Sequence, residues 1–343
     1  MRKVVVHSAG SHDRLTIEDH PDPAPGPGQI LVRTEAIGVN YADCVVRMGL
    51  YESARTYVGW PITPGFEFAG KVAALGDAAS PFAIGDEVFG VTRFGGYSSH
   101  VVVPHAQLFR IPAGFSLVEA ATFPTVFLTA WYALCELVRL RPNMTILVHS
   151  GAGGVGGALI QLARAHECRA IAVVGAAHKV AAASSLGASG VIDKSTEPLW
   201  QAAQRLAPDG YDVVLDANGA STLKRSYEHL RPTGKLVSYG FHSMMPRRGG
   251  RPNWPKLVFD FLRTPRFGPL QLTRDNKSVL AFNLSYLFER GDLLAEAMVG
   301  LLSLVAAGKL KPLPVRELPL DRVADAHRAL ESGATVGKLA LIP

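Results

Sequence analysis

Two patterns of apolar and polar residues follow each other along the chain. In the first third, short apolar runs alternate with polar positions and are separated by Gly-Asp and Gly-Gly turns, which is typical of a β-rich unit. A proline- and glycine-rich segment at 21–29 excludes helix and central strand there. The pattern predicts a hairpin within residues 1–20, one short helix, and strands, with the helix at 40–47 and the strands at 29–36, 67–75, 87–91 and 98–103.

Helical periodicity then begins at 117–140, with a second helical segment from Pro124. Strands and helices alternate as far as residue 240, and alternation over this length predicts a parallel sheet covered on both faces. The expected strands are 145–149, 169–174, 190–192, 211–215 and 234–239, and the expected helices are 154–165, 178–186, 197–206 and 221–230.

Beyond Gly240 the periodicity breaks down into a loop. A helix is expected at 256–262, followed by more loop to 276, and the tail returns to helix at 292–307, strand at 312–317, helix at 321–331 and a closing strand at 337–343. We therefore predict an α/β protein with two domains. The β-rich domain would be discontinuous, over residues 1–123 and 283–343, around a sheet domain over 124–282.

A glycine-rich turn follows the first strand of the predicted parallel sheet. Gly151, Gly153 and Gly156 have the spacing G-x-G-x-x-G between a strand and a helix that begins near Val155. In a dinucleotide site the first glycine allows the tight turn, the second lets a pyrophosphate approach the backbone, and the third lets the helix pack closely. The free N–H groups at the helix start would bind the phosphates. The strand–turn–helix context favours a dinucleotide site, which includes Gly154 and Val155, over a structural turn.

The end of the second strand indicates which nicotinamide is bound. A site for NAD places an acidic residue about 20 residues past the glycines, where it holds the ribose 2′-hydroxyl. This chain has Gly175-Ala176-Ala177-His178-Lys179 there, with no carboxylate to repel a 2′-phosphate and with Lys179 able to pair with it. The alternative is that Lys179 is a solvated lysine in the first turn of a helix. The missing acid and the present base together predict NADP(H).

The composition of the chain excludes some classes of protein but does not indicate a function. The net charge of +6 fits a phosphate-bearing ligand and fits a merely basic surface equally well. Three distant cysteines, Cys44, Cys135 and Cys168, suggest neither a disulfide framework nor a zinc ribbon. No apolar run has the length of a membrane span, and the N-terminus does not resemble a signal peptide, so we expect a cytoplasmic protein.

Ordered motifs along the whole chain resemble one family. They include GVNYADCVVRMGLY at 38–51, PGFEFAG at 64–70, GDEVFG at 85–90, LTAWYAL at 128–134, VHSGAGGVG at 148–156, LGASGVID at 186–193 and GKLALIP at 337–343. The chain resembles the zinc-independent medium-chain dehydrogenases/reductases of the quinone oxidoreductase group. The tracts RTPRFGPLQL and NKSVLAFNLSYLFE resemble the branch named for the synaptic vesicle amine transport protein. This resemblance implies a GroES-like catalytic domain, a Rossmann cofactor domain, and a homodimer that pairs the edge strands of its nucleotide domains.

The resemblance also bears on metal binding. Asn40 takes the place of a cysteine ligand of the zinc alcohol dehydrogenases, and Phe66 takes the place of their metal-binding histidine. A catalytic zinc needs three protein ligands, so with two of them changed we predict no metal. Cys44 is more simply a small packed residue than a ligand.

Without a Lewis acid, hydrogen-bond donors would have to stabilise the charge that develops on a carbonyl oxygen. Asn40 and Tyr51 match polar positions near the nicotinamide in the family and are the candidate donors, and Tyr51 or water would supply the proton. Asn40 could equally cap the short helix that follows it, and Tyr51 could equally be a tyrosine of a surface turn. Asp43 is expected to cap or pair structurally rather than act as a base, because an exposed Asp has a pKa near 3.9.

Motif matching implies further contacts to the cofactor. Residues at the carboxyl ends of strands lie where open α/β sheets bind ligands. Phe282, Asn283, Leu284 and Lys338 are expected to close over the nicotinamide from the other domain. Lys194 would add affinity for phosphate. The remaining predicted contacts are Thr129, Gly175, Asn218, Tyr239, Gly240 and Phe241.

The expected activity is reduction of quinones or α,β-unsaturated carbonyl compounds by NADPH in the cleft between the domains. The alternatives are an enoyl-thioester reductase and an NADPH-binding protein that acts through partners or membrane surfaces. The latter would depend on 242–276, where basic and aromatic residues mix. A surface helix with a packed apolar side is favoured there over a lid, a membrane patch or a partner surface, and no recognised nucleic-acid module accompanies the charge. The residues concerned are Arg247, Arg248, Arg251, Trp254, Lys256, Phe259, Phe261, Arg263, Arg266 and Phe267.

Overall fold

The computed structural model describes residues 1–77, 80–246 and 249–343. Arg247 and Arg248 therefore lie outside the described residues. The chain divides into two compact units. The first contains Met1–Leu128, residues 249–251 and Ser285–Pro343, and the second contains Thr129–Pro246 and Pro252–Leu284.

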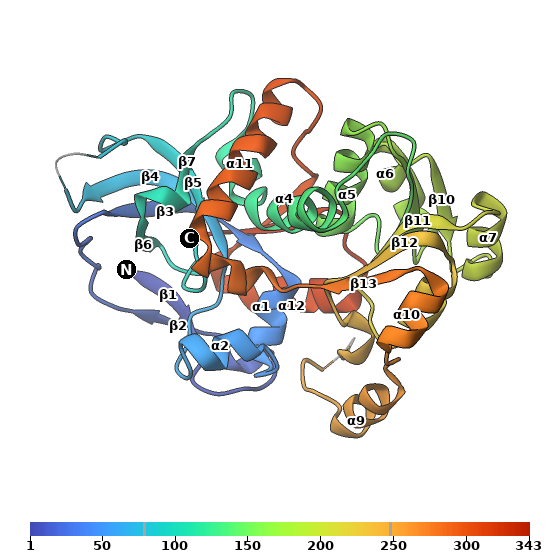
Figure 1. Ribbon diagram of the computed structural model, residues 1–343. Coiled ribbons are helices and arrows are strands. Elements are labelled where there is room, and N and C mark those ends of the chain that lie inside the picture. Colours follow the sequence, from blue (N-terminus) through green and yellow to red (C-terminus); the bar gives the residue numbers. More distant parts are fainter. Residues whose placement is uncertain (78–79, 247–248) are drawn as a thin grey trace. The chain divides into compact units, whose positions relative to one another are not determined.

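The first unit is built on a seven-stranded sheet with the order β14-β15-β3-β4-β5-β7, in which β6 also pairs with β3 (Figure 1). Apolar side chains of β3 to β7 alternate inward and form a core that includes Ile30, Val32, Phe68 and Val88. The predicted hairpin is present as antiparallel β1 (Arg2–Val5) and β2 (Thr16–Asp19). The sheet strands are β3 (Gln29–Val39), β4 (Glu67–Leu75), β5 (Glu87–Val91), β6 (His100–Pro104), β7 (Leu108–Arg110), β14 (Val315–Pro319) and β15 (Lys338–Ile342).

Short helices connect and cover these strands. Pro124 occupies the first turn of α4, where its missing N–H leaves no helical hydrogen bond unmade. Among the α-helices described in the first unit, α2 (Glu52–Tyr57) was not predicted, because six residues are too few to show a helical period. The others are α1 (Tyr41–Arg47), α3 (Leu117–Ala121), α4 (Pro124–Trp131), which enters the second unit, α11 (Gly291–Ala306) and α12 (Val323–Ser332).

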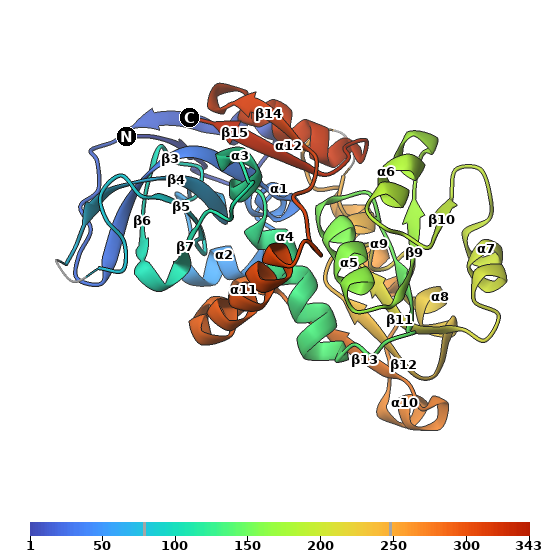
Figure 2. The ribbon, with the colours of Figure 1, turned by 90° about the horizontal axis from the view of Figure 1, so that it is seen from above.

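The second unit contains the predicted parallel sheet, with the strand order β10-β9-β8-β11-β12-β13. Figure 2 shows α5 and α6 along one face of this sheet and α7 and α8 along the other. Alternate side chains of β9 explain the two layers, because Ile171 and Val173 pack with α7 and α8 while Ala172 faces the glycine turn that leads into α5. The fold class predicted from the sequence is thereby confirmed.

The bounds of these elements agree closely with the predicted alternation. The strands are β8 (Thr145–Val148), β9 (Arg169–Val174), β10 (Gly190–Asp193), β11 (Tyr211–Asp216), β12 (Leu230–Ser238) and β13 (Ser278–Ala281). The helices are α5 (Gly154–Ala165), α6 (Val180–Ser185), α7 (Leu199–Leu206), α8 (Leu223–Glu228), α9 (Trp254–Arg263) and α10 (Pro269–Asp275), and a π-helix at Tyr132–Val138 continues α4.

The segment before residue 284 differs from the prediction. It was expected to be loop as far as Asn276, but α10 lies there, and the four residues of β13 then pair in parallel with β12. Phe282, Asn283 and Leu284 follow β13 directly and belong to the second unit. The expectation that they approach from the other domain is therefore wrong, because the sheet extends by one strand beyond the alternation that the sequence displays.

Helix α9 also corrects a prediction, because its apolar side is not packed. The side chains of Trp254, Phe261 and Leu262 are 63%, 68% and 71% exposed. The contact from α9 to the rest of its unit is made by the Lys256 ammonium, which is 43% exposed, donates to the carbonyl of Ser243 and pairs within the helix with Asp260. Figure 1 shows α9 standing apart from the strands of its unit. Within the described chain, no helix combines the length and apolarity needed to cross a membrane.

Candidate functional site

Asn40, the first predicted donor, belongs to a buried cluster of three polar side chains from distant parts of the first unit. Its amide Nδ2 donates to Glu67 Oε1 at 2.8 Å, and its Oδ1 accepts from Lys338 Nζ at 2.6 Å. The Lys338 ammonium also donates to Glu67 Oε1 at 2.8 Å and to the Val39 carbonyl at 2.9 Å. Both atoms that define the Asn40 amide plane are thus fixed by charged partners, so the amide is held in one orientation.

Glu67 was missed as a site residue, although it lies inside the motif quoted above. Its Oε2 accepts the N–H of Thr125 at 2.8 Å, so the carboxylate also fixes the start of α4. Gly38 provides the space, because a Cβ there would lie 2.5 Å from Glu67 Cγ and 2.6 Å from the Ala121 carbonyl oxygen. The sequence signal that could have indicated this role is the single acidic residue among apolar residues in FEFAG. A glutamate in a buried strand requires a buried group of opposite charge or a hydrogen-bond donor as its partner.

Lys338 was predicted to contact the cofactor. Its side chain is 3% exposed. The three N–H groups of its ammonium are matched by three acceptors within the protein. This geometry fits a residue that positions Asn40 and neutralises Glu67, and direct contact with a cofactor stays a prediction.

Tyr51, the second predicted donor, is the N-cap residue of α2 and packs in an aromatic cluster. Its ring lies edge-on to Phe66 at 5.8 Å and to Phe94 at 6.4 Å between centroids, and Phe66 lies 5.2 Å from Phe94. Phe66 directly precedes Glu67, the first residue of β4. Tyr51 therefore lies beside the start of the strand whose Glu67 carboxylate binds the Asn40 amide. An aromatic ring fills the place of the metal-binding histidine.

Asp43 holds the start of α1, as its capping role predicted. Its carboxylate accepts the N–H of Asn40 at 2.8 Å and of Gly65 at 3.0 Å, and the Tyr97 hydroxyl at 2.9 Å. The assumption that this carboxyl is exposed is wrong, since Asp43 is fully buried. Burial raises its pKa to about 7, against the lowering by its hydrogen bonds and by the charge of Lys338.

The raised pKa predicts how stability depends on pH. The folded chain keeps the Asp43 proton up to about pH 7, whereas the unfolded chain releases it near 3.8. The contribution of Asp43 to the free energy of unfolding therefore falls as pH rises from about 4 to about 7. At 1.36 kcal/mol per pKa unit, this amounts to up to about 4 kcal/mol. Asp43→Asn has no proton to release there, so its free energy of unfolding minus that of the native chain should rise with pH over this range, from a starting value lowered because the amide nitrogen cannot accept the hydrogen bonds of one carboxylate oxygen.

Urea unfolding of the native chain and of Asp43→Asn between pH 4.5 and 8 would measure this difference. The difference is the informative quantity, because burial holds the pKa of His327 well below 6.5, and its contribution to stability rises with pH instead. Parallel pH profiles for the two proteins would contradict the assignment.

A second buried group joins α1 to α12. Arg47 donates to Glu331 at 2.7 Å and to His327 Nδ1 at 3.2 Å, and its side chain is fully buried. Cys44, His327 and Glu331 bring a sulfur, a nitrogen and an oxygen within 4.8 Å of one another, as a metal site would. The Arg47 guanidinium already supplies the positive charge there, so the group is an ion-pair network. The packed role predicted for Cys44 agrees with its full burial.

In the second unit, the glycine turn has the tight geometry that a dinucleotide site needs. Helix α5 begins at Gly154, with Gly153 at its N-cap. A Cβ at Gly156 would lie 2.2 Å from the Ser150 carbonyl oxygen, and a Cβ at Gly151 would lie 2.7 Å from the Cβ of Ala172. Only glycine fits these two positions, and Val155 follows in the first turn. The turn leaves the N–H groups at the start of α5 available to an anion.

The end of β9 has the positive character predicted for it. Gly175 follows the strand, and a Cβ there would meet the Lys194 side chain at 3.5 Å. Burial lowers the pKa of Lys179, and the positive charge of Lys194 lowers it further, so the two lysines lie close enough to repel. The nearest strand-end acid, Asp193, is turned toward Ser195, whose N–H and hydroxyl it accepts at 2.9 and 2.6 Å.

The carboxyl ends of β11 and β12 hold the other predicted contacts. Asp216 accepts the N–H of Asn218 at 2.8 Å and fixes the loop after β11. The Tyr239 hydroxyl is buried and has no hydrogen-bond partner within the described chain, and Phe241 is 46% exposed. The ring of Phe282 lies 6.5 Å from that of Tyr239. An orphaned hydroxyl and an exposed ring fit a ligand at this edge. Gly240 lies between Tyr239 and Phe241 in the chain. Thr129, another predicted contact, is a buried residue of α4.

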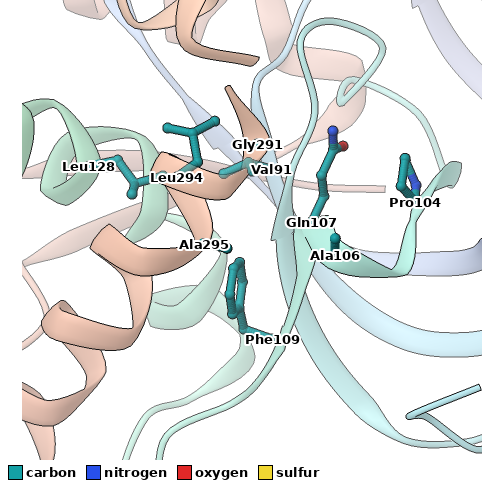
Figure 3. Close-up of a pocket in the computed structure, with 9 residues that line it drawn as sticks. All are labelled: Val91, Pro104, Ala106, Gln107, Phe109, Leu128, Gly291, Leu294 and Ala295. Atoms are coloured by element: carbon teal, nitrogen blue, oxygen red, sulfur yellow. The ribbon is translucent and has the colours of Figure 1, made fainter. Parts of the chain in front are cut away.

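A separate cavity of about 190 Å³ lies in the first unit between the start of α11 and the strands β5 and β7. Figure 3 shows Leu294 and Ala295 of α11 on one side and Pro104, Ala106, Gln107 and Phe109 on the other. None of the predicted site residues lines it. Its walls are apolar apart from Gln107, so no set of polar groups converges there for catalysis.

Comparisons with known proteins agree with this geometry. The family model of the alcohol dehydrogenase GroES-like domain matches residues 26–113, and that of the zinc-binding dehydrogenases matches residues 186–341. The synaptic vesicle membrane protein VAT-1 homolog of Rattus norvegicus is 34% identical over 100% of this chain and 84% of its own length. The chain belongs to the medium-chain dehydrogenase/reductase family.

Within that family, it belongs to the quinone oxidoreductase group of oxidoreductases and to the VAT-1 branch. The Escherichia coli quinone oxidoreductase complexed with NADPH matches it with a TM-score of 0.86 and 29% identity over 100% of both chains. A 2-haloacrylate reductase of Burkholderia sp is 30% identical over 99% of this chain and 98% of its own length.

The residues of this chain do not fit the catalytic zinc that the resemblance to the zinc alcohol dehydrogenases would call for. The matched zinc-binding dehydrogenase model begins at residue 186, beyond Asn40 and Phe66. The Asn40 amide is held by Glu67 and Lys338, and the Phe66 ring packs on Tyr51 and Phe94. Neither offers the sulfur or imidazole nitrogen that zinc requires.

Proposed function

We propose that this protein is an NADPH-dependent reductase of quinones or α,β-unsaturated carbonyl compounds. The observation that carries the proposal is the buried Asn40–Glu67–Lys338 cluster in place of a metal ligand. It presents an oriented amide donor, and such donors suffice to stabilise the charge that develops when a conjugated system accepts hydride. The names of two relatives, a quinone oxidoreductase and a 2-haloacrylate reductase, describe activated acceptors of this kind.

The features of the second unit support NADPH as the hydride donor. Bound NADPH would supply hydride from C4 of its nicotinamide. The turn at Gly151–Gly156 would receive the pyrophosphate, and Lys179 with Lys194 would pair with the 2′-phosphate. The similar E. coli enzyme is described as a complex with NADPH.

Asn40 and Tyr51 would act on the acceptor. The Asn40 Nδ2 has two N–H groups, of which one donates to Glu67 and the other can donate to a substrate oxygen. The Tyr51 hydroxyl would donate a second hydrogen bond and supply the proton that balances the added hydride. Phe66 and Phe94 provide an apolar wall for a planar conjugated substrate.

Self-association is part of the proposal. Strand β13 is the edge of the parallel sheet, and its first and last residues, Ser278 and Ala281, are exposed. An unpaired strand edge is a ready site for pairing with a second copy. We therefore expect a homodimer that pairs β13 with its equivalent.

Steady-state oxidation of NADPH would test the activity. The acceptors would be 1,2- and 1,4-quinones, simple enones and a crotonyl thioester, with NADH run in parallel. We expect turnover of quinones or enones. Preference for the thioester would favour an enoyl-thioester reductase, and tight NADPH binding without any turnover would contradict the reductase proposal.

The donors can be tested in the same assay. The double variant Asn40→Ala, Tyr51→Phe should lose about 100-fold or more in kcat, because removing one oriented donor of this kind typically costs 10²–10³. NADPH affinity, measured by fluorescence titration, should change little. Unaltered turnover would place the donors elsewhere.

One observation favours the second candidate function, a nucleotide-binding protein that acts through a partner or membrane surface. The apolar side of α9 faces outward, with Trp254, Phe261 and Leu262 exposed. Under this alternative, charged substitutions on α9 would abolish the function, whereas variants of Asn40 and Tyr51 would leave it intact.

A further inference from the structure

Arg93, in the first unit, has a guanidinium with no anionic partner among the residues that the structure describes. It lies in the loop after β5, is partly exposed, and makes neither a salt bridge nor a hydrogen bond with any of the described residues. Its Nε is buried and has no acceptor. A buried donor left without a partner costs about 1–3 kcal/mol, so this arrangement calls for an explanation.

Aromatic rings hold the guanidinium in place. Its Cζ lies 3.8 Å from the ring centroid of Tyr57 and 5.9 Å from that of Phe288. Tyr57 is fixed in turn by a hydrogen bond from its hydroxyl to Glu289 and by an edge contact with Tyr286 at 6.1 Å. Cation–π contacts orient the guanidinium plane but do not satisfy its N–H groups.

The nearby charges do not neutralise Arg93. Glu289, the acid of this group, is used by the Tyr57 hydroxyl and makes no ion pair with Arg93 within the described chain. Arg290, the next residue, pairs with Asp292 at 2.8 Å. A preformed cation with free N–H groups is therefore presented on an aromatic support, which is how proteins bind planar anions.

The position of Arg93 connects it with the proposed catalytic residues. The next residue in the chain, Phe94, packs against Phe66 and Tyr51. Helix α2 links the two places as well, with Tyr51 at its N-cap and Tyr57 at its end. A substrate whose conjugated part lies on Phe66 and Phe94 would reach Arg93 by extending along α2, from Tyr51 at its N-cap toward Tyr57 at its end.

We propose that Arg93 binds a carboxylate of the substrate, so that the preferred substrates are conjugated carbonyl compounds that carry a carboxylate group. This inference rests on the proposed function, which it narrows to anionic acceptors. A single guanidinium matches the single charge and the two oxygens of a carboxylate. Arg93 is a specificity residue in this account, whereas Asn40 and Tyr51 act on the carbonyl.

The test compares an acid with its neutral ester. The substrates are 4-oxo-4-phenylbut-2-enoate and its methyl ester, which share the reducible bond and the aromatic ring. Arg93→Gln should raise KM for the acid about 10- to 100-fold, the range for a lost charged hydrogen-bonding pair, and should leave KM for the ester within about twofold. Arg93→Lys keeps the positive charge but lacks the paired N–H donors of the guanidinium. It should therefore raise KM for the acid less than Arg93→Gln does.

Arg55→Gln is the matched control. Arg55 lies on α2, is 65% exposed and pairs with Glu52, so its loss removes a charge from the same region and should change neither KM. Equal effects of Arg93→Gln on acid and ester would overturn the inference, because a merely structural role would affect both. If Arg93→Gln fails to fold, the same comparison with Arg93→Lys decides.

Calorimetry separates this inference from the proposed function. Binding of the saturated analogue 4-oxo-4-phenylbutanoate and of its methyl ester is measured with NADP⁺ present, in the native chain and in Arg93→Gln. Binding of the acid that depends on Arg93, without turnover of any acceptor, would support the anion site and reject the reductase. Suppose instead that neutral enones are turned over and that Arg93→Gln does not change the preference for the acid over the ester. That result would support the reductase proposal and contradict the proposed carboxylate site at Arg93.

Discussion

Replacing Lys338 with Met is expected to lower the free energy of unfolding of the first unit by about 3–5 kcal/mol, because removal of one partner leaves a buried charge without compensation. Glu67 would be that charge, since its side chain is fully buried and pairs with Lys338 at 2.8 Å. The loss is a large fraction of the stability of an ordinary domain. Urea unfolding followed by circular dichroism would measure it, with separate transitions fitted for the two units.

Two further variants show whether charge is the cause. Glu67→Gln combined with Lys338→Met removes both charges and should recover part of the loss, since buried pairs replaced together cost far less than one partner alone. Lys71→Met is the surface control. Lys71 is 40% exposed and lies 3.4 Å from Glu87, and exposed pairs contribute about 0–1 kcal/mol. If Lys338→Met and Lys71→Met had similar effects, the cluster would not have the energetic role described.

The second large effect concerns the proposed cofactor. Lys179→Ala is expected to lower the preference for NADPH over NADH, expressed as a ratio of kcat/KM values, by about 10- to 100-fold, since a hydrogen bond to a charged group contributes about 1.5–3 kcal/mol. Burial and, after it, the like charge of Lys194 lower the pKa of Lys179, so the two ammonium groups lie near each other. Lys194→Ala should act in the same direction with a smaller effect, because Lys194 is exposed.

Values of kcat/KM for the two cofactors, with one acceptor held constant, would check this prediction. The NADH values should stay within about twofold, because NADH has no 2′-phosphate to lose contact with. Lys224→Ala is the matched control, since Lys224 lies on α8 of the same unit and is 77% exposed. An unchanged preference in Lys179→Ala would mean that another group recognises the phosphate.

The elements with the strongest periodicity could be predicted from the sequence. Strand β9 has the predicted bounds because five apolar residues in a row are bounded by a charged residue and a glycine. The glycine turn was equally clear, since its spacing, preceding strand and following helix all agree. Asn40 and Tyr51 were found as candidates by resemblance. Their neighbours Glu67 and Lys338 show why Asn40 has a fixed orientation, which motifs alone do not reveal.

Other features depend on packing that local patterns do not encode. Asp43 has the sequence environment of an ordinary helix cap, and its burial results from Tyr97, a residue 54 positions away. Arg93 belongs to none of the motifs, and its lack of a hydrogen-bond or ion-pair partner among the described residues is a property of the folded loop. The periodicity of α9 shows that an apolar side exists but not which way it faces, since that depends on contacts outside the helix such as the hydrogen bond from Lys256 to the Ser243 carbonyl.

The cluster around Asn40 also constrains the order in which the chain can become functional. Lys338 and Val39 are separated by 299 positions in the sequence, and the residues between them include the whole second unit. During synthesis, β3 and β4 emerge long before β15. The Glu67 carboxylate therefore has no ion pair with Lys338 until the closing strand has been synthesised. Early folding of the inserted unit would shorten the loop that β15 must close. A nascent chain stalled before residue 338 would therefore carry a folded second unit while Glu67 and Asn40 still lack their lysine, and incompletely folded chains of this kind are prone to aggregate.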